Sequence, residues 1–319
     1  MTHVILAKNV NHAFKDAWWW LRAAGLRESS RNGNVLVAPG PVVTEYKRPW
    51  ERVLWSPKRD ANPVFHLMEA IWMIAGQNEV DWLSQFSHNI ANYAEVNGVM
   101  HGAYGYRWRH EFAQDQLKSV IKILKDDPNS RQAVMQMWSA EVDLLSKKKD
   151  KPCNTHIYFD CRGGQLNMTV CCRSNDMLWG AYGANAVHMS FLQELIALEL
   201  KSNVGIYRQM SNNFHVYTDL PMVKDFLENP PHESYDRYQE GAFALPLLLE
   251  YETLKDFVDD CEHFVKDGKV MTTEFMKMAA RLRDVYYLRK EKKDYAELLR
   301  TVTPCDWKGA FIDWAERRI

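Results

Sequence analysis

Two short segments of this chain alternate apolar and polar residues, which is typical of strands with one buried face. The segments cover residues 155–161 and 165–172, and Arg162-Gly163-Gly164 between them supplies a glycine turn. The pattern therefore predicts a β-hairpin. Two further strands are predicted, one over residues 132–138 and one that begins at Val35.

The clearest helix signal lies between Asn62 and Gly76. Asn62 is a favourable N-cap, Pro63 suits the first helical position, and Gly76 ends the pattern. The residues between them are apolar on nearly every side, so this helix is predicted to be buried. Glu69 is thus a carboxylate inside a buried helix, either a functional group or one satisfied by a partner in the core.

Amphipathic spacing predicts further helices, the first of which leads into a polar turn over residues 29–34. These helices cover residues 12–27, 115–125, 186–200, 253–266, 273–289 and 295–301. Helices and strands do not alternate regularly, which favours an α+β fold. No linker-like segment divides the chain. We therefore expect one domain over residues 1–319, in which about 251–319 form a helical C-terminal extension.

Composition excludes several classes of protein. A net charge of -1 argues against nucleic-acid binding. A membrane span needs about 18 apolar residues in a row, and no apolar run in this sequence is that long. The six cysteines form no CxxC pair, and the eleven histidines form no HxH or HxxxH pair joined to cysteines, so we expect no metal site. Without a secretory leader, a cytoplasmic location is expected.

Three consecutive tryptophans, Trp18, Trp19 and Trp20, fall on the first predicted helix. Consecutive helical residues point about 100° apart, so these side chains cannot all face the core. We expect part of this indole surface to pack against another subunit or an appended segment of the chain.

The candidate chemistry gathers around the hairpin. Cys153 precedes it, and Arg173 and Ser174 follow it, so the thiol and the guanidinium meet if the hairpin folds back. A nearby guanidinium lowers the pKa of a thiol toward neutrality and produces a nucleophilic thiolate. Arg173 and Ser174 together suit a phosphate group. The alternatives are a small core cysteine and an ordinary surface arginine.

These residues resemble the thymidylate synthase family and its relatives, the phage deoxynucleotide hydroxymethylases. The similarity covers residues 31–217, with motifs such as Pro152-Cys153-Asn154 and Gly102-Ala103-Tyr104-Gly105 in the family's order. The resemblance implies a mixed β-sheet flanked by helices. It also implies that Cys153 adds to C6 of a pyrimidine, that Tyr104 assists removal of the C5 proton, and that Glu69 manages protons and water at the base.

The resemblance assigns the remaining nucleotide contacts. Arg31, Arg173 and Ser174 hold the 5′-phosphate, and Arg131 reaches the phosphate of a neighbouring subunit in a homodimer. Asn185 reads the edge of the base. Three other positions, at the sugar and at the cofactor, complete the implied set: His215 and Tyr217 for the 3′-hydroxyl, and Asp176 for the pterin of 5,10-methylenetetrahydrofolate.

Four departures from the family pattern bear on the product. Asn154 replaces a histidine, Gln132 replaces a second arginine, and Ile90 and Tyr93 stand where synthases carry tryptophans. One of those tryptophans shields the exocyclic methylene intermediate from water. The fourth departure is that the segment ending at Asn185 is one residue longer.

Asn154 adds a polar group near the base, and the replaced tryptophans remove an indole. Both changes favour attack on the methylene by water over reduction by hydride. We therefore expect conversion of dUMP to 5-hydroxymethyl-dUMP, since the amide of Asn185 can serve uracil. Three alternatives stay open: thymidylate synthesis, hydroxymethylation of dCMP or CMP, and an inactive structural or nucleic-acid-binding relative.

Overall fold

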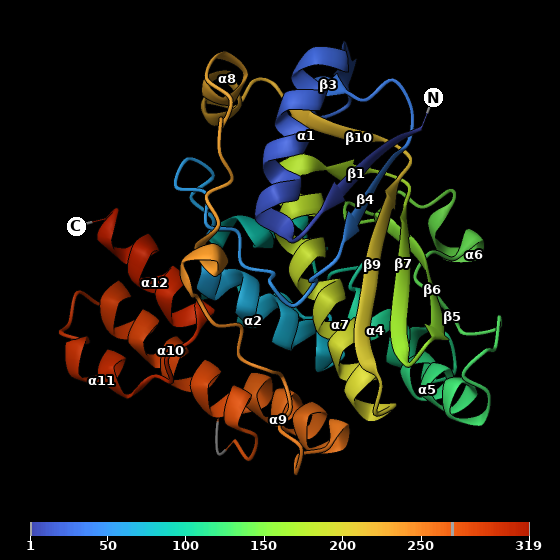
Figure 1. The fold of residues 1–319 in the computed structure, drawn as a ribbon, viewed down its shortest axis with the longest axis vertical. Helices are drawn as coiled ribbons and strands as arrows, with labels where there is room; N and C mark the ends of the chain where they lie inside the picture. Colours follow the sequence, from blue (N-terminus) through green and yellow to red (C-terminus); the bar gives the residue numbers. More distant parts are fainter. Residues whose placement is uncertain (1, 269–270, 319) are drawn as a thin grey trace.

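The computed structural model describes residues 2–268 and 271–318 and confirms an α+β architecture (Figure 1). Its larger sheet has six strands in the order β1-β4-β9-β7-β6-β5. Parallel pairs (β1 with β4, and β7 with β9) and antiparallel pairs make the sheet mixed. The strands are β1 (His3–Ala7), β4 (Val42–Tyr46), β5 (Val134–Gln136), β6 (Asn154–Arg162), β7 (Gln165–Cys172) and β9 (Asn203–Ser211).

A smaller sheet of four strands has the order β2-β3-β10-β8. These strands are β2 (Leu26–Ser30), β3 (Gly33–Val37), β8 (Asn175–Asp176) and β10 (Phe214–Tyr217). Because β10 pairs with both β3 and β8, this sheet brings the β2–β3 turn, the end of β10 and the segment after Arg173 to one place.

Helices cover the inner face of the large sheet. The central ones are α2 (Pro63–Ile74) and α7 (Asn185–Glu199), beside α1 (Val10–Ala24). The predicted start of α2 is confirmed, because the Asn62 side chain accepts hydrogen bonds from the Val64 and Phe65 amides at 3.1 and 3.2 Å. The other helices before the extension are α3 (Asp81–Ser84), η1 (His88–Tyr93), α4 (Tyr104–Tyr106), η2 (Arg107–Glu111), α5 (Gln116–Asp126), α6 (Ala140–Asp143), η3 (Met177–Ala184), α8 (Pro221–Glu228) and η4 (Arg237–Glu240).

The C-terminal extension is helical, as predicted, and packs on the core. Its helices are α9 (Leu254–Lys266), α10 (Glu274–Lys290), α11 (Ala296–Thr301) and α12 (Asp306–Glu316). Three of them, α9, α10 and α12, contact α2, and Trp307 of α12 lies edge-on to Phe191 of α7 at 6.3 Å between ring centroids. The extension is thus the outer cover of the two buried helices, and within the described ranges no helix has the length and apolar character for crossing a bilayer.

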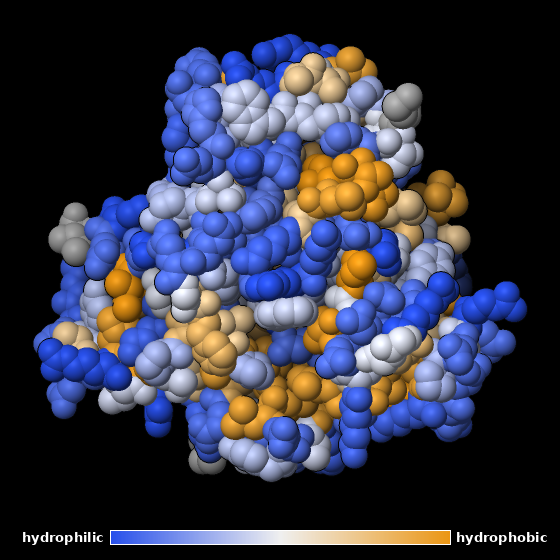
Figure 2. Space-filling model, viewed as in Figure 1, coloured by the Kyte–Doolittle hydropathy of each residue, from blue (hydrophilic) through white to orange (hydrophobic). Residues whose placement is uncertain are grey.

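The outer face of the large sheet carries two rows of paired residues, and no helix of the described residues covers them. Strand register aligns the rows Val4–Val43–Met210–Cys171–His156–Gln136 and Leu6–Glu45–Arg208–Thr169–Tyr158–Val134. Leu6 is 63% exposed, Val4 51% and Tyr158 47%. Figure 2 shows apolar side chains gathered on the surface over the region where β1 and β4 lie in Figure 1.

Two predictions near the N-terminus are wrong. The helix predicted over residues 12–27 ends at Ala24, and the polar turn predicted over 29–34 is β2, a two-residue turn and the start of β3. The chain leaves the helix at Gly25, whose backbone is extended, and only glycine fits there because a Cβ would lie 2.5 Å from the Leu21 carbonyl oxygen. The polar sequence of β2 gave no strand signal because this strand is exposed along its whole length.

The three consecutive tryptophans point in different directions, as their spacing on a helix requires. Trp18 is buried and stacks on Phe226 at 4.6 Å, and Trp20 stacks on His3 at 4.0 Å. The outward-facing Trp19 donates a hydrogen bond from Nε1 to the Pro231 carbonyl at 2.7 Å. The exposed indole therefore contacts a later segment of the same chain.

Candidate active site

The β6–β7 hairpin brings Cys153 and Arg173 together, as its sequence predicts. The Arg173 amide donates to the Cys153 carbonyl at 2.8 Å, and Arg173 Nη2 lies 3.9 Å from Cys153 Sγ. The guanidinium also donates to the Pro152 and Lys151 carbonyls at 3.0 and 3.2 Å. These bonds hold an exposed cation beside a half-buried thiol.

The expected lowering of the thiol pKa toward neutrality is not found. Burial raises the pKa of the Cys153 thiol, and this effect outweighs the lowering by Arg173. The Asp150 and Asp176 carboxylates raise it further. The thiol is therefore protonated near neutral pH, and Arg173 only moderates that preference.

Tyr104 lies against the backbone of the nucleophile. Its hydroxyl oxygen accepts hydrogen bonds from the Cys153 amide at 3.2 Å and the Asn154 amide at 3.3 Å. Burial raises the pKa of Tyr104 well above its ordinary value, so the phenol stays neutral. The following Gly105 lets this loop touch α2, because a Cβ there would lie 1.7 Å from the Met73 carbonyl oxygen.

Glu69 has a partner in the core. Its Oε2 lies 3.1 Å from His188 Nε2, across the contact between α2 and α7, and the two side chains are 15% and 5% exposed. Both interpretations of Glu69 are therefore compatible with the geometry, since the carboxylate lies close to an imidazole and is still partly accessible.

A chain of buried amides runs next to the nucleophile. Asn154 Nδ2 donates to Asn185 Oδ1 at 2.8 Å, and Asn185 Nδ2 donates to Asn175 Oδ1 at 3.1 Å. Cys172 Sγ lies 2.8 Å from Asn154 Oδ1. All three asparagines are at most 3% exposed.

The extra residue before Asn185 is accommodated by helix geometry. The segment Met177–Ala184 is a π-helix, whose wider turn holds one residue more than an α-helical turn. The insertion therefore does not carry Asn185 away from Asn154, and the predicted base-reading amide stays beside the nucleophile.

Asp176 fits a group that donates hydrogen bonds. Its Oδ1 caps η3 by accepting from the Leu178 and Trp179 amides at 2.8 and 2.6 Å, whereas its buried Oδ2 has no hydrogen-bond partner among the described residues. Burial raises the pKa of Asp176 to about 6. The adjacent Trp179 is half exposed, with the Arg59 guanidinium 4.2 Å above its ring. A buried acceptor beside an exposed ring is compatible with a flat heterocycle that carries N–H donors.

The small sheet and its turns carry residues that the sequence predicts for the phosphate and the sugar. Arg31 is exposed in the β2–β3 turn, and its neighbour Asn32 donates to Tyr217 Oη at 3.5 Å. His215 is buried, and its Nδ1 has no hydrogen-bond partner among the described residues. Ser174 is half-buried directly before β8, which pairs with β10. Arg131 is exposed close to the start of the edge strand β5, so the single chain leaves it free to face solvent or a partner.

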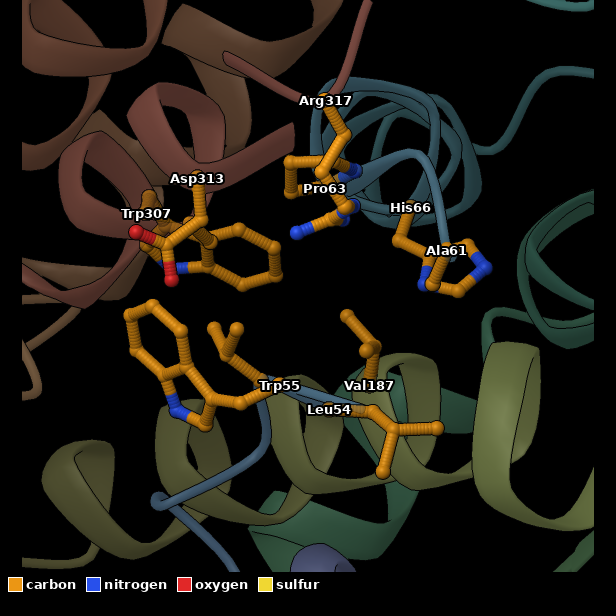
Figure 3. A pocket seen from close by; sticks show the side chains of 11 residues that line it. Leu54, Trp55, Ala61, Pro63, His66, Val187, Trp307, Asp313 and Arg317 are labelled. Atoms are coloured by element: carbon orange, nitrogen blue, oxygen red, sulfur yellow. The ribbon is translucent and has the colours of Figure 1, made fainter. Parts of the chain in front are cut away.

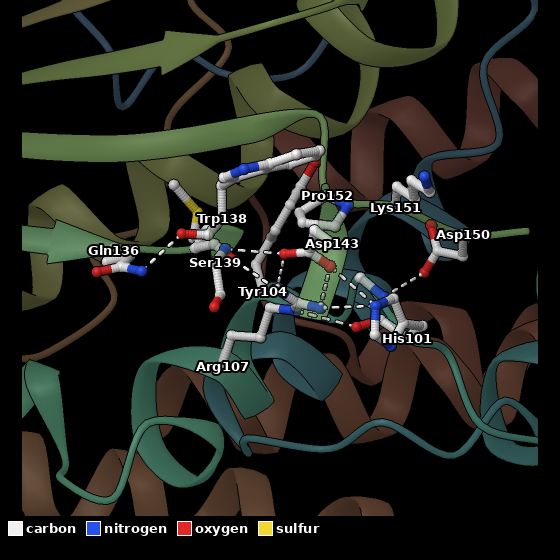
Figure 4. Close-up of polar contacts among 12 residues, drawn as sticks. His101, Tyr104, Arg107, Gln136, Trp138, Ser139, Asp143, Asp150, Lys151 and Pro152 are labelled. Carbon is white, nitrogen blue, oxygen red and sulfur yellow. Dashed lines mark hydrogen bonds and ion pairs between the residues drawn. The ribbon is translucent and has the colours of Figure 1, made fainter. Parts of the chain in front are cut away.

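Sequence reasoning missed Asp150. Its Oδ2 accepts the Gly102 amide at 2.8 Å, and burial raises its pKa (Figure 4). To one side of it, Arg107 Nη1 and Asp143 Oδ2 form a buried pair at 2.7 Å, with His101 Nε2 2.8 Å from Asp143 Oδ1 (Figure 4). The lysine-rich surroundings of Asp150 indicated a solvated loop, and the only available signal was its position three residues before Cys153.

A small cavity lies between α2, the segment before it and the C-terminal helix. The indoles of Trp55 and Trp307 face each other beside Asp313, and Arg317 and His66 lie at its other end (Figure 3). Arg317 Nε also donates to Asp60 Oδ1 at 3.1 Å, so the end of the chain is fastened to the segment that leads into α2. Burial lowers the pKa of His66 to about 3, which keeps this imidazole neutral.

Comparison with known proteins gives a consistent result. The family model described as thymidylate synthase matches residues 58–238. Deoxyuridylate hydroxymethyltransferase of Pseudomonas phage M6 is 38% identical over 99% of this chain and 94% of its own length, and its counterpart from Bacillus phage SP01 is 30% identical over 75% and 73%. Thymidylate synthase of Corynebacterium aurimucosum is 28% identical over 52% of this chain and 63% of its own length.

Proposed function

This chain belongs to the thymidylate synthase family, and we propose that it converts dUMP to 5-hydroxymethyl-dUMP with 5,10-methylenetetrahydrofolate. The observation that carries the proposal is the 38% identity to a deoxyuridylate hydroxymethyltransferase over 99% of the chain. The thymidylate synthase relative matches only about half of the chain. A location in the cytoplasm of a phage host is part of the same proposal.

Cys153 supplies the nucleophile. The thiolate bonds to C6 of the uracil ring, and the electron pair of the C5–C6 double bond moves toward O4, which makes C5 reactive. Arg173 lies 3.9 Å from the sulfur and stabilises the thiolate, while Asn185 and Asn154 face the charge that develops on O4. Tyr104 then takes part in removing the C5 proton, from its position 3.2 Å from the Cys153 amide.

The folate supplies one carbon at the oxidation level of formaldehyde. Asp176 would hold its pterin through the otherwise unpaired Oδ2, and Trp179 would lie beside the ring. On the substrate, the phosphate would be held by Arg31, Arg173 and Ser174, and the sugar hydroxyl by His215 and Tyr217.

Water quenches the exocyclic methylene in this proposal. Tyr93, at a position where synthases carry tryptophan, is 56% exposed on η1, and Ile90 of the same short helix is half-buried. Neither residue provides the broad indole that shields the methylene in synthases. Asn154 and Glu69 supply polar groups that can order an attacking water.

A homodimer completes the phosphate site in this proposal. The outer face of the large sheet exposes Val4, Leu6 and Tyr158, and a second copy could cover this surface by two-fold symmetry. Arg131 precedes the edge strand of that same sheet, so it would lie at the rim of such an interface and could reach the partner's phosphate.

Product mass tests the reaction. The protein is incubated with dUMP and methylenetetrahydrofolate, and we expect the nucleotide to gain one CH₂O unit without formation of dihydrofolate. Gain of CH₂ with dihydrofolate absorbance would make the protein a thymidylate synthase, and turnover of dCMP alone would reassign the base. Cys153→Ala should lower turnover on the order of 10⁴-fold or more. Unchanged turnover in that variant would contradict the mechanism.

A further inference from the structure

The amide chain beside the nucleophile continues to a fixed anchor on the large sheet. Gln209 of β9 is fully buried, and its Nε2 donates to the Ala181 carbonyl at 3.3 Å and to Tyr207 Oη at 2.9 Å. A backbone carbonyl can only accept. Tyr207 in turn donates its own proton to the Asn185 carbonyl at 3.2 Å, so it also must accept from Gln209. Both contacts therefore fix which end of the Gln209 amide carries the N–H groups.

The orientation of the Gln209 amide determines the orientation of the Asn175 amide. With its NH₂ group committed, Gln209 presents Oε1 to Asn175, whose Nδ2 donates to it at 2.5 Å and to Ser211 Oγ at 2.9 Å. Asn175 must then turn Oδ1 toward Asn185, which donates to it at 3.1 Å. Reversing either amide would bring two acceptors or two donors face to face in a buried site.

The packing leaves room for this arrangement and for little else. A Cβ at Gly180 would lie 2.5 Å from Asn175 Oδ1 and 3.8 Å from Asn185 Nδ2. Gly180 thus permits the hydrogen bond between the two asparagines. Asn175 is 2% exposed and Gln209 is 0% exposed, so water cannot substitute for a lost partner without entering the core.

We propose that Gln209, acting through Asn175, fixes the direction of the Asn185 amide and so makes the site select uracil over cytosine. The inference rests on the proposed function, because it assumes that Asn185 meets the base. Asn185 retains one N–H on Nδ2 and one lone pair on Oδ1 after its bonds to Asn175 and Asn154. These suit O4 and N3–H of uracil. Cytosine presents N4–H₂ and an unprotonated N3, which require the reverse orientation.

Nucleotide binding without folate tests this role. The dissociation constants of dUMP and dCMP are measured by calorimetry on the full chain, and the wild type should bind dUMP about 10- to 100-fold more tightly. Gln209→Leu removes the anchor on the Asn175 side, so that only the hydrogen bond from Asn154 still opposes reversal of the Asn185 amide. We expect that preference to fall about tenfold or more, through both weaker dUMP binding and stronger dCMP binding.

Two further variants separate positioning from general damage. Gln193→Leu is the matched control, because Gln193 is equally buried and donates to the Leu166 carbonyl at 2.9 Å, outside the amide chain. It should lower stability and leave the ratio of dissociation constants unchanged. If Gln209→Leu does not fold, Asn175→Leu should lower the ratio in the same way, because it removes the acceptor that faces Asn185 Nδ2.

The outcomes separate this inference from the proposed reaction. A folded Gln209→Leu variant with the wild-type ratio would overturn the inference, as would a wild type that prefers dCMP. Conversion of dUMP to thymidylate would reject hydroxymethylation, yet the measured base preference and its loss in Gln209→Leu would still support the anchor. Binding of neither nucleotide would overturn both.

Discussion

At the scale of single residues, the thiol of Cys153 lies between opposing charges. Arg173 lowers its pKa, while burial, Asp150 and Asp176 raise it. The balance keeps the sulfur protonated near neutral pH, so the proton has to leave before the thiolate can attack.

Substitution of the two flanking charges should shift thiol reactivity in opposite directions. Arg173→Gln removes the cation and should move the midpoint of Cys153 alkylation to higher pH. Asp150→Asn removes a negative charge and should move it to lower pH. The measurement is the pH dependence of iodoacetamide labelling, read by peptide mass spectrometry, with Cys161 and Cys171 as internal controls. Shifts of the same sign in both variants would refute this account of the thiol.

Asp176 illustrates the stability cost of a buried carboxylate. Burial raises its pKa from 3.8 to about 6, so folding disfavours the ionised form. This penalty is absent below pH 3.8, grows as pH rises, and is complete above about pH 6. The full shift corresponds to about 3 kcal/mol at neutral pH.

Asp176→Asn should therefore stabilise the protein and weaken folate binding. An asparagine oxygen can still cap η3, so we expect a gain of about 1–3 kcal/mol in the free energy of unfolding at about pH 7.5 and little gain near pH 4. Urea denaturation at both pH values measures this. Binding of a folate analogue in the presence of dUMP should weaken about tenfold or more. A variant that loses stability at neutral pH would contradict the burial argument.

At the scale of elements, the contact between α4 and α2 sets the distance between Tyr104 and the helix that carries Glu69. The contact depends on Gly105, since any Cβ would overlap the Met73 carbonyl. The backbone of α2 cannot yield locally, because α9, α10 and α12 hold its other side. A substitution at Gly105 must therefore separate the two elements.

Gly105→Ala should cost about 3 kcal/mol or more in the free energy of unfolding and reduce turnover at the same time. Gly98→Ala is a useful comparison. Gly98 has a positive φ of 79° with no atom near its absent Cβ, so only backbone strain of about 1 kcal/mol is expected there. Chemical denaturation of both variants measures the difference. Equal costs would show that the α4–α2 contact is not tight.

Elements whose signals are local were predicted from the sequence. The Asn62 cap, the Arg162-Gly163-Gly164 hairpin and the C-terminal helices each rest on nearby residues, and the structure confirms them. Strands β1, β4 and β9 were not predicted. Strand β9 pairs with β4, about 160 residues earlier in the chain, and such pairing leaves no mark in either segment alone.

The candidate site divides in the same way. Cys153 and Arg173 could be brought together in advance because one hairpin separates them. Gln209 lies on a strand that was not predicted, and its role depends on the Ala181 carbonyl, a backbone atom with no signal in the sequence. Asp150 was hidden by its lysine neighbours, since its burial comes from the Gly102 loop.

At the scale of the whole molecule, the uncovered face of the large sheet and the exposed Arg131 both favour a homodimer. In the proposed function, the site in a single chain supplies Arg31, Arg173 and Ser174 for the phosphate. If a partner supplies Arg131, each site needs residues from both chains. A dimer of two different inactive variants should then keep one active site, in which each chain supplies the residue that the other chain lacks.

Mixing two inactive variants tests this arrangement. Arg131→Glu and Cys153→Ala homodimers should each be inactive, whereas hybrid dimers contain one site with an intact cysteine and an intact partner arginine. After dissociation and reassociation, the mixture should recover roughly one quarter of wild-type activity. Recovery is followed by product formation, with each variant treated alone as the control. No recovery despite hybrid formation would place Arg131 in its own chain's site.

The run of amides from Gln209 to Asn154 also constrains how this lineage could diversify. A single substitution can weaken the selectivity between the two pyrimidines. Reversing the selectivity would require several side chains and a backbone acceptor to be reoriented together. Drift one codon at a time would pass through promiscuous ancestors before reaching an enzyme dedicated to the other base.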